Sequence, residues 1–140
     1  MERGAGRSAL GAGEKRKVTD FRDLVVWRKG REIARAVYEQ TRAFPSDELF
    51  GLTNQMRRSA VSITSNIAEG FNRRGSREFH RFVSVALGSC GELRSLILIA
   101  EDQNFLAADM ARLLEEQVTK EERMLGALQR SLAQRPAPSA

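Results

Sequence analysis

Residues 76–102 read SREFHRFVSVALGSCGELRSLILIAED, and this stretch decides the fold. Its apolar side chains recur after four and then three residues, at Phe79, Val83, Ala86, Cys90, Leu93, Ile97 and Ala100. That spacing is typical of the buried seam between packed α-helices. A second stripe follows Phe82, Val85, Ser89, Leu96 and Ile99. Because a helix that is apolar on two sides needs two partners, we expect this one to pack in its own bundle and against another subunit.

Two glycines interrupt the same helical stretch. Gly88 and Gly91 each cost about 1 kcal/mol of helix stability relative to alanine. The usual reason to tolerate such residues is a close approach between two helices. We therefore expect a neighbouring helix to pass near them.

Three further helical stripes flank this stretch. The first helix is expected at residues 24–41, capped by Asp20 or Asp23 and ended by Phe44-Pro45-Ser46. The second is expected to start at Thr53 as N-cap and to stop at Gly70, with the stripe Leu52, Met56, Ala60, Ile63 and Ile67.

The last helix is expected from Asp109, as N-cap, to about Leu132. Its stripe comprises Met110, Leu114, Val118, Glu121, Leu125, Leu128 and Leu132. The connections between the four helices are short, which favours antiparallel neighbours. The sequence therefore predicts an all-α, up-down-up-down antiparallel four-helix bundle. We divide the chain into a disordered basic Gly/Arg-rich tail (residues 1–20), a bundle domain (21–133) and a second disordered tail (134–140).

Composition limits the function classes. With 140 residues, 6% aromatic residues and three prolines, the chain suits one helical domain rather than a β-sandwich. There is no run of about 18 uncharged apolar residues, so we expect no membrane span, and the N-terminus lacks the apolar segment of a signal peptide. A single cysteine forms no intrachain disulfide, which fits the cytoplasm. The net charge of +5 suits an anionic partner, and it equally suits a basic protein that binds none.

Arginines crowd the second connection and the helix that follows it. They are Arg73, Arg74, Arg77 and Arg81, and Arg57 and Arg58 add charge on the preceding helix. Guanidinium groups and a helix N-terminus suit phosphate oxygens, so these six residues are the candidate nucleic-acid-binding site. The competing interpretation is a solvated surface whose charges pair with nearby glutamates. Since no aromatic residues interleave the arginines in the manner of a base-stacking platform, any binding should be to the backbone, weakly sequence-specific and steeply salt-dependent.

A polar stripe follows the second helix at Gln55, Ser59, Ser62, Asn66 and Glu69. It is either a surface that faces a pore or ligand, or a hydrogen-bonded seam between helices or subunits. We favour the structural seam, because small residues permit close approach and buried polar groups need partners.

No catalytic, cofactor or metal site is expected. His80 is the only histidine, and neighbouring carboxylates do not supply ligands at the spacing of a metal site. Cys90 lies on the core seam, where a thiol packs like a small hydrophobe. We therefore expect a protein that is not an enzyme.

Several motifs together resemble a known family. They are Phe21-Arg22-Asp23-Leu24-Val25-Val26-Trp27, Gly51-Leu52-Thr53, Arg57-Arg58, Ser65-Asn66-Ile67-Ala68-Glu69-Gly70 and Gly88-Ser89-Cys90-Gly91-Glu92-Leu93. Across residues 21–132 the chain resembles the bacterial four helix bundle protein family, also named for open reading frames in intervening sequences of large-subunit ribosomal RNA genes. It departs from the family in its long N-terminal tail, in Cys90, and in Phe50, where tyrosine is usual.

The resemblance implies a ring-shaped homo-oligomer, typically a homopentamer, without established catalytic activity. The family is similar in fold to the accessory protein of diversity-generating retroelements, which binds a reverse transcriptase and nucleic acid. By this analogy, the expected partners are copies of the chain itself, RNA or DNA, and a reverse transcriptase or other nucleic-acid enzyme. The alternative is a protein-interaction scaffold with no nucleic-acid role, since fold does not fix function.

Overall fold

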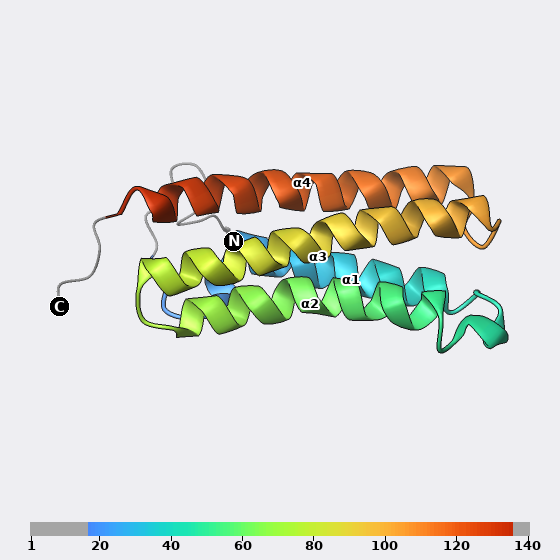
Figure 1. Ribbon diagram of the computed structural model, residues 1–140, viewed down its shortest axis with the longest axis horizontal. Coiled ribbons are helices and arrows are strands. Elements are labelled where there is room, and N and C mark those ends of the chain that lie inside the picture. The colour runs from blue at the N-terminus through green and yellow to red at the C-terminus, as the bar shows by residue number, and fades with distance from the viewer. Residues whose placement is uncertain (1–16, 136–140) are drawn as a thin grey trace.

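A computed structural model describes residues 17–135, and the described chain is entirely helical outside its turns (Figure 1). The helices are α1 (Val25–Thr41), α2 (Leu52–Asn72), α3 (Ser76–Asp102) and α4 (Ala108–Ala133). Two short 3₁₀ turns, η1 (Phe21–Asp23) and η2 (Ser46–Glu48), precede α1 and α2. Consecutive helices run antiparallel, and no strand occurs within residues 17–135, which confirms the predicted all-α four-helix bundle.

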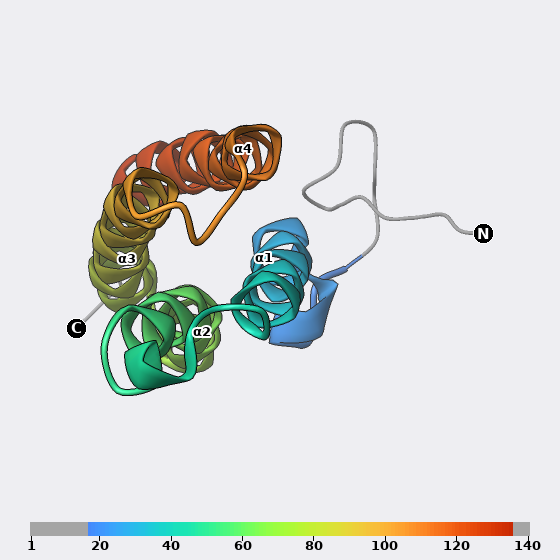
Figure 2. The same ribbon diagram turned by 90° about the vertical axis from the view of Figure 1, so that its right-hand side faces the viewer.

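The four helices stand around one core, and successive helices are neighbours (Figure 2). The α2–α3 and α3–α4 sides are closely packed, whereas the α1–α4 side is the loosest of the four. Helices α3 and α4 are the longest, at 27 and 26 residues. On the loose side, a cavity lies between α1 and α4.

The seam predicted on α3 is the centre of the core. Val83, Ala86, Cys90, Leu93, Ile97 and Ala100 are all fully buried. The second stripe divides, since Ser89 and Leu96 are buried while Val85 and Ile99 are nearly half exposed. By length and composition α3 would also suit a membrane span, but the core helix of a bundle has the same composition.

Three predicted N-caps are wrong. Helix α1 begins after Leu24, which makes no side-chain cap, and Asp20 and Asp23 cap the preceding turn η1 instead. Helix α2 begins at Leu52, one residue before the predicted cap, and Thr53 is buried in its first turn. The cap comes instead from Glu48, whose Oε1 accepts a hydrogen bond from the Leu52 N–H at 3.1 Å. Helix α4 begins after Ala107, so Asp109 lies in its first turn, where an acidic side chain favours the helix dipole.

Gly70 does not end α2, which corrects the prediction of a helix-stopping glycine. The helix continues to Asn72, and Gly70 is buried inside it. A Cβ atom at Gly70 would lie 2.6 Å from Phe82 Cβ and 3.0 Å from Phe79 Cδ1. The glycine is therefore required for the close approach of α2 to α3. The left-handed glycine is Gly75, with φ 131°, at the cap of α3.

The packed chain begins before Phe21. Asp20 and Asp23 form a reciprocal cap of η1: the Arg22 N–H donates to Asp20 and the Asp20 N–H donates to Asp23, both at 3.1 Å. Val18 packs against the core. Residues 18–20, assigned above to the tail, thus join the bundle. Of the rest of the predicted tails, residue 17 and residues 134–135 are described at the two ends of the bundle, and residues 1–16 and 136–140 lie outside the described residues.

Candidate nucleic-acid interface

The α2–α3 turn and the first turns of α3 hold four of the six candidate arginines. Arg73 pairs with Glu69 at 2.8 Å, one helical turn back on α2. Arg81 pairs with Glu78 at 3.1 Å on α3. Both guanidinium groups also lie over the ring of Phe82, at 5.1 and 4.5 Å from its centroid. These contacts hold two of the arginines in fixed positions.

Arg74 and Arg77 complete this group, which we call the turn cluster (Arg73, Arg74, Arg77 and Arg81). Both are exposed, and neither makes an ion pair with any residue between 17 and 135. They stand beside the start of α3, where backbone N–H groups are unpaired and the helix dipole is positive. The cluster therefore presents two arginines without an ion pair among residues 17–135 at one end of the bundle, and Arg81, with Arg73 and Arg77, helps to lower the pKa of the nearby Glu78 carboxyl.

Arg57 and Arg58 do not join the turn cluster. They lie on α2 about 24 Å from Arg73, given 1.5 Å of rise per residue. The Arg57 Nε donates to Thr41 Oγ1 at 2.8 Å, and its guanidinium lies 4.6 Å from the centre of the Tyr38 ring. Together with Tyr38 they line a shallow hollow on the α1–α2 side. The six predicted arginines thus form two separate basic patches.

The aromatic neighbours were missed in the sequence. Phe82 and Tyr38 each lie against an arginine in these two patches. Along the chain, Phe79 lies between Arg77 and Arg81, and Phe82 directly follows Arg81. Tyr38 comes from α1, so only the packing of α1 on α2 brings it to Arg57. The contact of Phe82 with Arg81 could have been predicted from the sequence, because the two residues are neighbours in the chain.

The five polar residues predicted as a seam on α2 lie in different environments. Ser62 Oγ and Ser89 Oγ are 2.8 Å apart and join α2 to α3, and the Asn66 amide donates to the Ser62 carbonyl at 2.8 Å. Ser59 is buried, and its Oγ has no hydrogen-bond partner within the described chain. Gln55 is exposed, and exposed Glu69 pairs with Arg73. The bridge between helices is therefore Ser62–Ser89, with Asn66 behind it.

One face of α3 is open to solvent. Val85, Leu98 and Ile99 are nearly half exposed there, and a Cβ added at Gly88 or Gly91 would meet nothing within 4 Å. No helix of the same subunit approaches these glycines, contrary to what a close approach inside the bundle would require.

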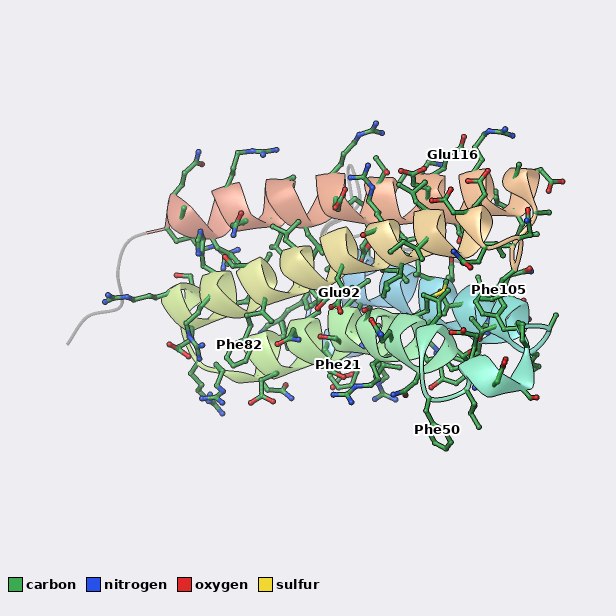
Figure 3. All side chains as sticks on the ribbon, turned by 45° about the vertical axis from the view of Figure 1, so that its right-hand side comes forward. Phe21, Phe50, Phe82, Glu92, Phe105 and Glu116 are labelled. Carbon is green, nitrogen blue, oxygen red and sulfur yellow. The ribbon has the colours of Figure 1, made fainter. Side chains whose placement is uncertain are left out.

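Phe50 is a separate exposed residue. It projects from the turn before α2 and is 90% exposed (Figure 3).

Glu121 is the functional candidate that sequence reasoning missed. It is fully buried on α4, and neither carboxylate oxygen has a hydrogen-bond partner within residues 17–135. Burial raises the pKa of this carboxyl from 4.5 to about 8, against a smaller lowering by Lys29. On α3, burial raises the pKa of the Cys90 thiol far above its usual range, and the nearby Glu121 and Glu122 raise it further. Cys90 is therefore an unreactive thiol at neutral pH.

The described residues contain no group of three His, Cys, Asp or Glu side chains able to hold a metal ion.

The profile of one family, described as 23S rRNA-intervening sequence protein, matches residues 22–127. This chain belongs to that family. The match covers the bundle from η1 into the second half of α4.

A solved structure supports the same fold for this chain. A protein of unknown function from the S23 ribosomal protein family of Bacteroides thetaiotaomicron is similar, with a TM-score of 0.69 and 20% sequence identity. The similarity covers 76% of this chain and 96% of that chain. No curated protein matches. The family is thus established, and the similar structure adds the fold alone.

Proposed function

We propose that this protein is a non-enzymatic, cytoplasmic homo-oligomer that binds the backbone of nucleic acid through its turn cluster. The observation that carries the proposal is the pair Arg74 and Arg77, exposed and without ion pairs among residues 17–135, beside the start of α3. Arg73 and Arg81, steadied by Phe82, extend the same positive surface. Fork-shaped guanidinium groups of this kind suit phosphate oxygens.

In a cyclic homo-oligomer the turn cluster would recur around the axis. Several weak contacts on one strand then add through effective concentration, so modest charge per subunit suffices. A nucleic-acid enzyme such as a reverse transcriptase would meet the same assembly on a shared strand. This part of the proposal rests on the resemblance described above.

The triple variant Arg73→Ala, Arg74→Ala, Arg77→Ala is expected to weaken binding to RNA and DNA. The logarithm of the affinity falls with the logarithm of salt by roughly 0.9 for each phosphate contact on duplex DNA, and each lost contact should reduce that slope accordingly. Fluorescence anisotropy with single- and double-stranded RNA and DNA across a salt series measures both quantities.

The matched control removes the same charge elsewhere, as Arg112→Ala, Lys120→Ala, Arg123→Ala on the outer face of α4. If both triple variants lose the same affinity, net charge alone explains binding and the turn cluster is not the site. Failure of the unaltered protein to bind at low salt would remove the proposal.

Self-association is proposed through the open face of α3, and we propose a homopentamer. The double variant Gly88→Ala, Gly91→Ala separates two effects. Inside one subunit each added methyl meets nothing within 4 Å, so helix stability should rise by about 1 kcal/mol per site. In the assembly the same methyl groups should hold the subunits apart and weaken association.

Light scattering and thermal unfolding of this double variant test the two effects together. The expected result is a smaller species with a more stable subunit. An unaltered assembly, or a wild-type protein that is monomeric at micromolar concentration, contradicts the proposed interface.

A protein-interaction scaffold is the second candidate function. The observation in its favour is Phe50, 90% exposed beside the half-exposed Leu49 at the turn before α2. Such an aromatic side chain is a frequent anchor in protein interfaces. A partner protein that remains bound after nuclease treatment, and that is lost in Phe50→Ser, would favour this function over nucleic-acid binding.

A further inference from the structure

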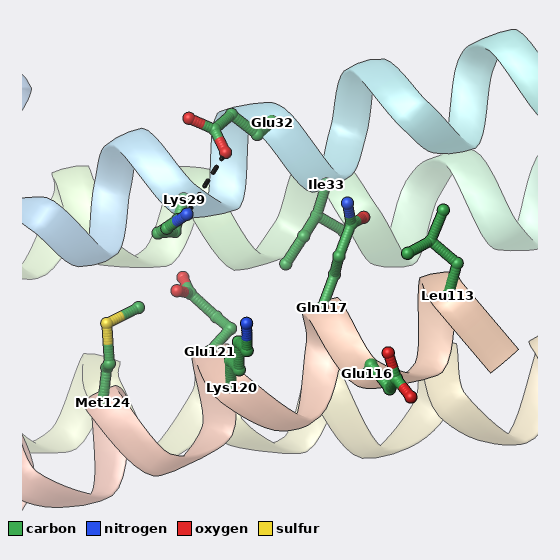
Figure 4. Close-up of a pocket in the computed structure, with 9 residues that line it drawn as sticks. All are labelled: Lys29, Glu32, Ile33, Leu113, Glu116, Gln117, Lys120, Glu121 and Met124. Atoms are coloured by element: carbon green, nitrogen blue, oxygen red, sulfur yellow. Dashed lines mark ion pairs between the residues drawn. The ribbon is translucent and has the colours of Figure 1, made fainter.

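The loose α1–α4 side of the bundle contains a cavity of about 190 Å³ (Figure 4). Its apolar walls come from Ile33 on α1 and from Leu113 and Met124 on α4. The cavity is large enough for a molecule of several non-hydrogen atoms, and it is open to solvent between the two helices.

Glu121 projects from α4 into this cavity toward α1 (Figure 4). Its side chain is fully buried, and both oxygens lack hydrogen-bond partners in the described chain. Gly30 on α1 makes room for it, because a Cβ at that position would lie 3.2 Å from Glu121 Oε2 and 2.9 Å from Thr64 Cγ2. The packing thus accommodates a carboxyl group that nothing in the described chain satisfies.

Gln117 adds a second acceptor one turn before Glu121. Its Oε1 is buried in the same cavity and also lacks a donor among residues 17–135. A buried carboxylate and a buried amide oxygen without donors are costly unless another molecule supplies N–H groups. The chemistry that satisfies both is a positively charged nitrogen with several protons.

We propose that the α1–α4 cavity binds a small organic cation, with its ammonium group on Glu121 and its short alkyl chain against Ile33, Leu113 and Met124. This site is separate from the turn cluster and does not depend on nucleic-acid binding.

The charges at the cavity rim do not replace such a ligand. Lys29 Nζ pairs with Glu32 Oε1 at 3.5 Å and forms no ion pair with Glu121. Lys120 and Glu116 also line the cavity, so the two rim lysines face two rim glutamates. Glu121 remains the one fully buried charge-bearing group of the lining. Binding of an ammonium should favour its ionised form and release its proton, so affinity should rise with pH.

Isothermal calorimetry with n-butylammonium tests the site, with n-butanol as the matched compound that lacks the charge. We expect saturable binding of the amine at millimolar concentration and none of the alcohol. Repeating the titration in buffers of different ionisation enthalpy should show proton release near neutral pH. A lysine side chain offers the same ammonium, and Nα-acetyl-lysine-methylamide distinguishes that source: its binding alone would assign the site to a protein lysine.

Two variants make the result specific. Glu121→Gln keeps the shape and should weaken amine binding roughly 10- to 100-fold, the effect of a charged hydrogen bond. Glu39→Gln removes an exposed carboxylate of α1 outside the cavity and should change amine binding little. No saturable binding of any of these amines, unchanged affinity in Glu121→Gln, or an equal loss of affinity in Glu39→Gln would each overturn the proposal.

Discussion

The Gly70→Ala variant is expected to lose about 1 kcal/mol of unfolding free energy, although the substitution improves helix propensity. The new Cβ would lie 2.6 Å from Phe82 Cβ, an atom fixed to the backbone of α3, and 3.0 Å from Phe79 Cδ1. Relief requires α2 and α3 to separate, and such overpacking costs about 1–3 kcal/mol. The gain of about 1 kcal/mol from replacing a helical glycine only partly offsets it. Chemical denaturation followed by circular dichroism measures the difference.

Gly126→Ala is the matched control within α4. Its added Cβ would meet only the end of the Arg130 side chain, at 3.5 Å. The same chemical change should therefore stabilise the protein by about 1 kcal/mol. The two alanine variants are expected to differ in sign. If both stabilise, Gly70 has no packing role and the α2–α3 contact is looser than the structure indicates.

Gly70 also shows where sequence reasoning ends. Apolar spacing was sufficient to predict four helices, because burial of one stripe per helix is a property of the local sequence. Apolar spacing was not sufficient to predict the role of a single glycine, because glycine suits both the end of a helix and the close approach of two helices. Only the position of Phe82 on another helix distinguishes them. The prediction that Thr53 caps α2 was wrong for a similar reason, because the cap comes from Glu48 in the preceding turn.

Part of the candidate site could likewise be predicted from the sequence, and part could not. Arg73, Arg74, Arg77 and Arg81 are close in sequence, so the chain alone brings them to one end of the bundle. The separation of Arg57 and Arg58 was also readable, since helical rise fixes it. The stacking of Arg57 on Tyr38 was not readable, because it depends on how α1 packs against α2.

Glu121 had a usable signal. It occupies a core position between Val118 and Leu125 on the α4 stripe, where an apolar residue is expected. A single charged residue at such a position often has a specific role. Two features could not be predicted from the sequence. Gly30 lies opposite the carboxyl and makes room for it, and no donor among the described residues lies near it.

The Glu121→Met variant is expected to be more stable than the wild type by about 3 kcal/mol at pH 7. Burial raises the pKa of Glu121 from 4.5 to about 8 in the folded protein. Between these values the folded state holds a proton that the unfolded state has released. Unfolding free energy therefore falls as pH rises from about 4.5 through about 8, at about 1.4 kcal/mol per unit. Methionine has no such proton and fills similar volume.

The measurement is the difference in unfolding free energy between wild type and Glu121→Met at several pH values. The groups facing Glu121 are common to both proteins, so their own titration largely cancels: Lys29 and Glu32 from α1, Cys90 from α3, and Glu116, Lys120 and Glu122 from α4. On α2, Ile63 and Thr64 lie beside Gly30 near this position, and neither side chain titrates.

The advantage of methionine should be small near pH 4.5 and should grow steadily to about pH 8. Glu121→Gln should gain less than methionine, because its amide remains buried without a partner. A constant difference across this pH range would mean that Glu121 ionises normally in the folded state, and a destabilised methionine variant would mean that the carboxylate is already paired. The same residue that weakens the isolated fold is the one that gives the α1–α4 cavity its charge, so we expect saturating n-butylammonium to recover part of the stability in wild type and none in Glu121→Met.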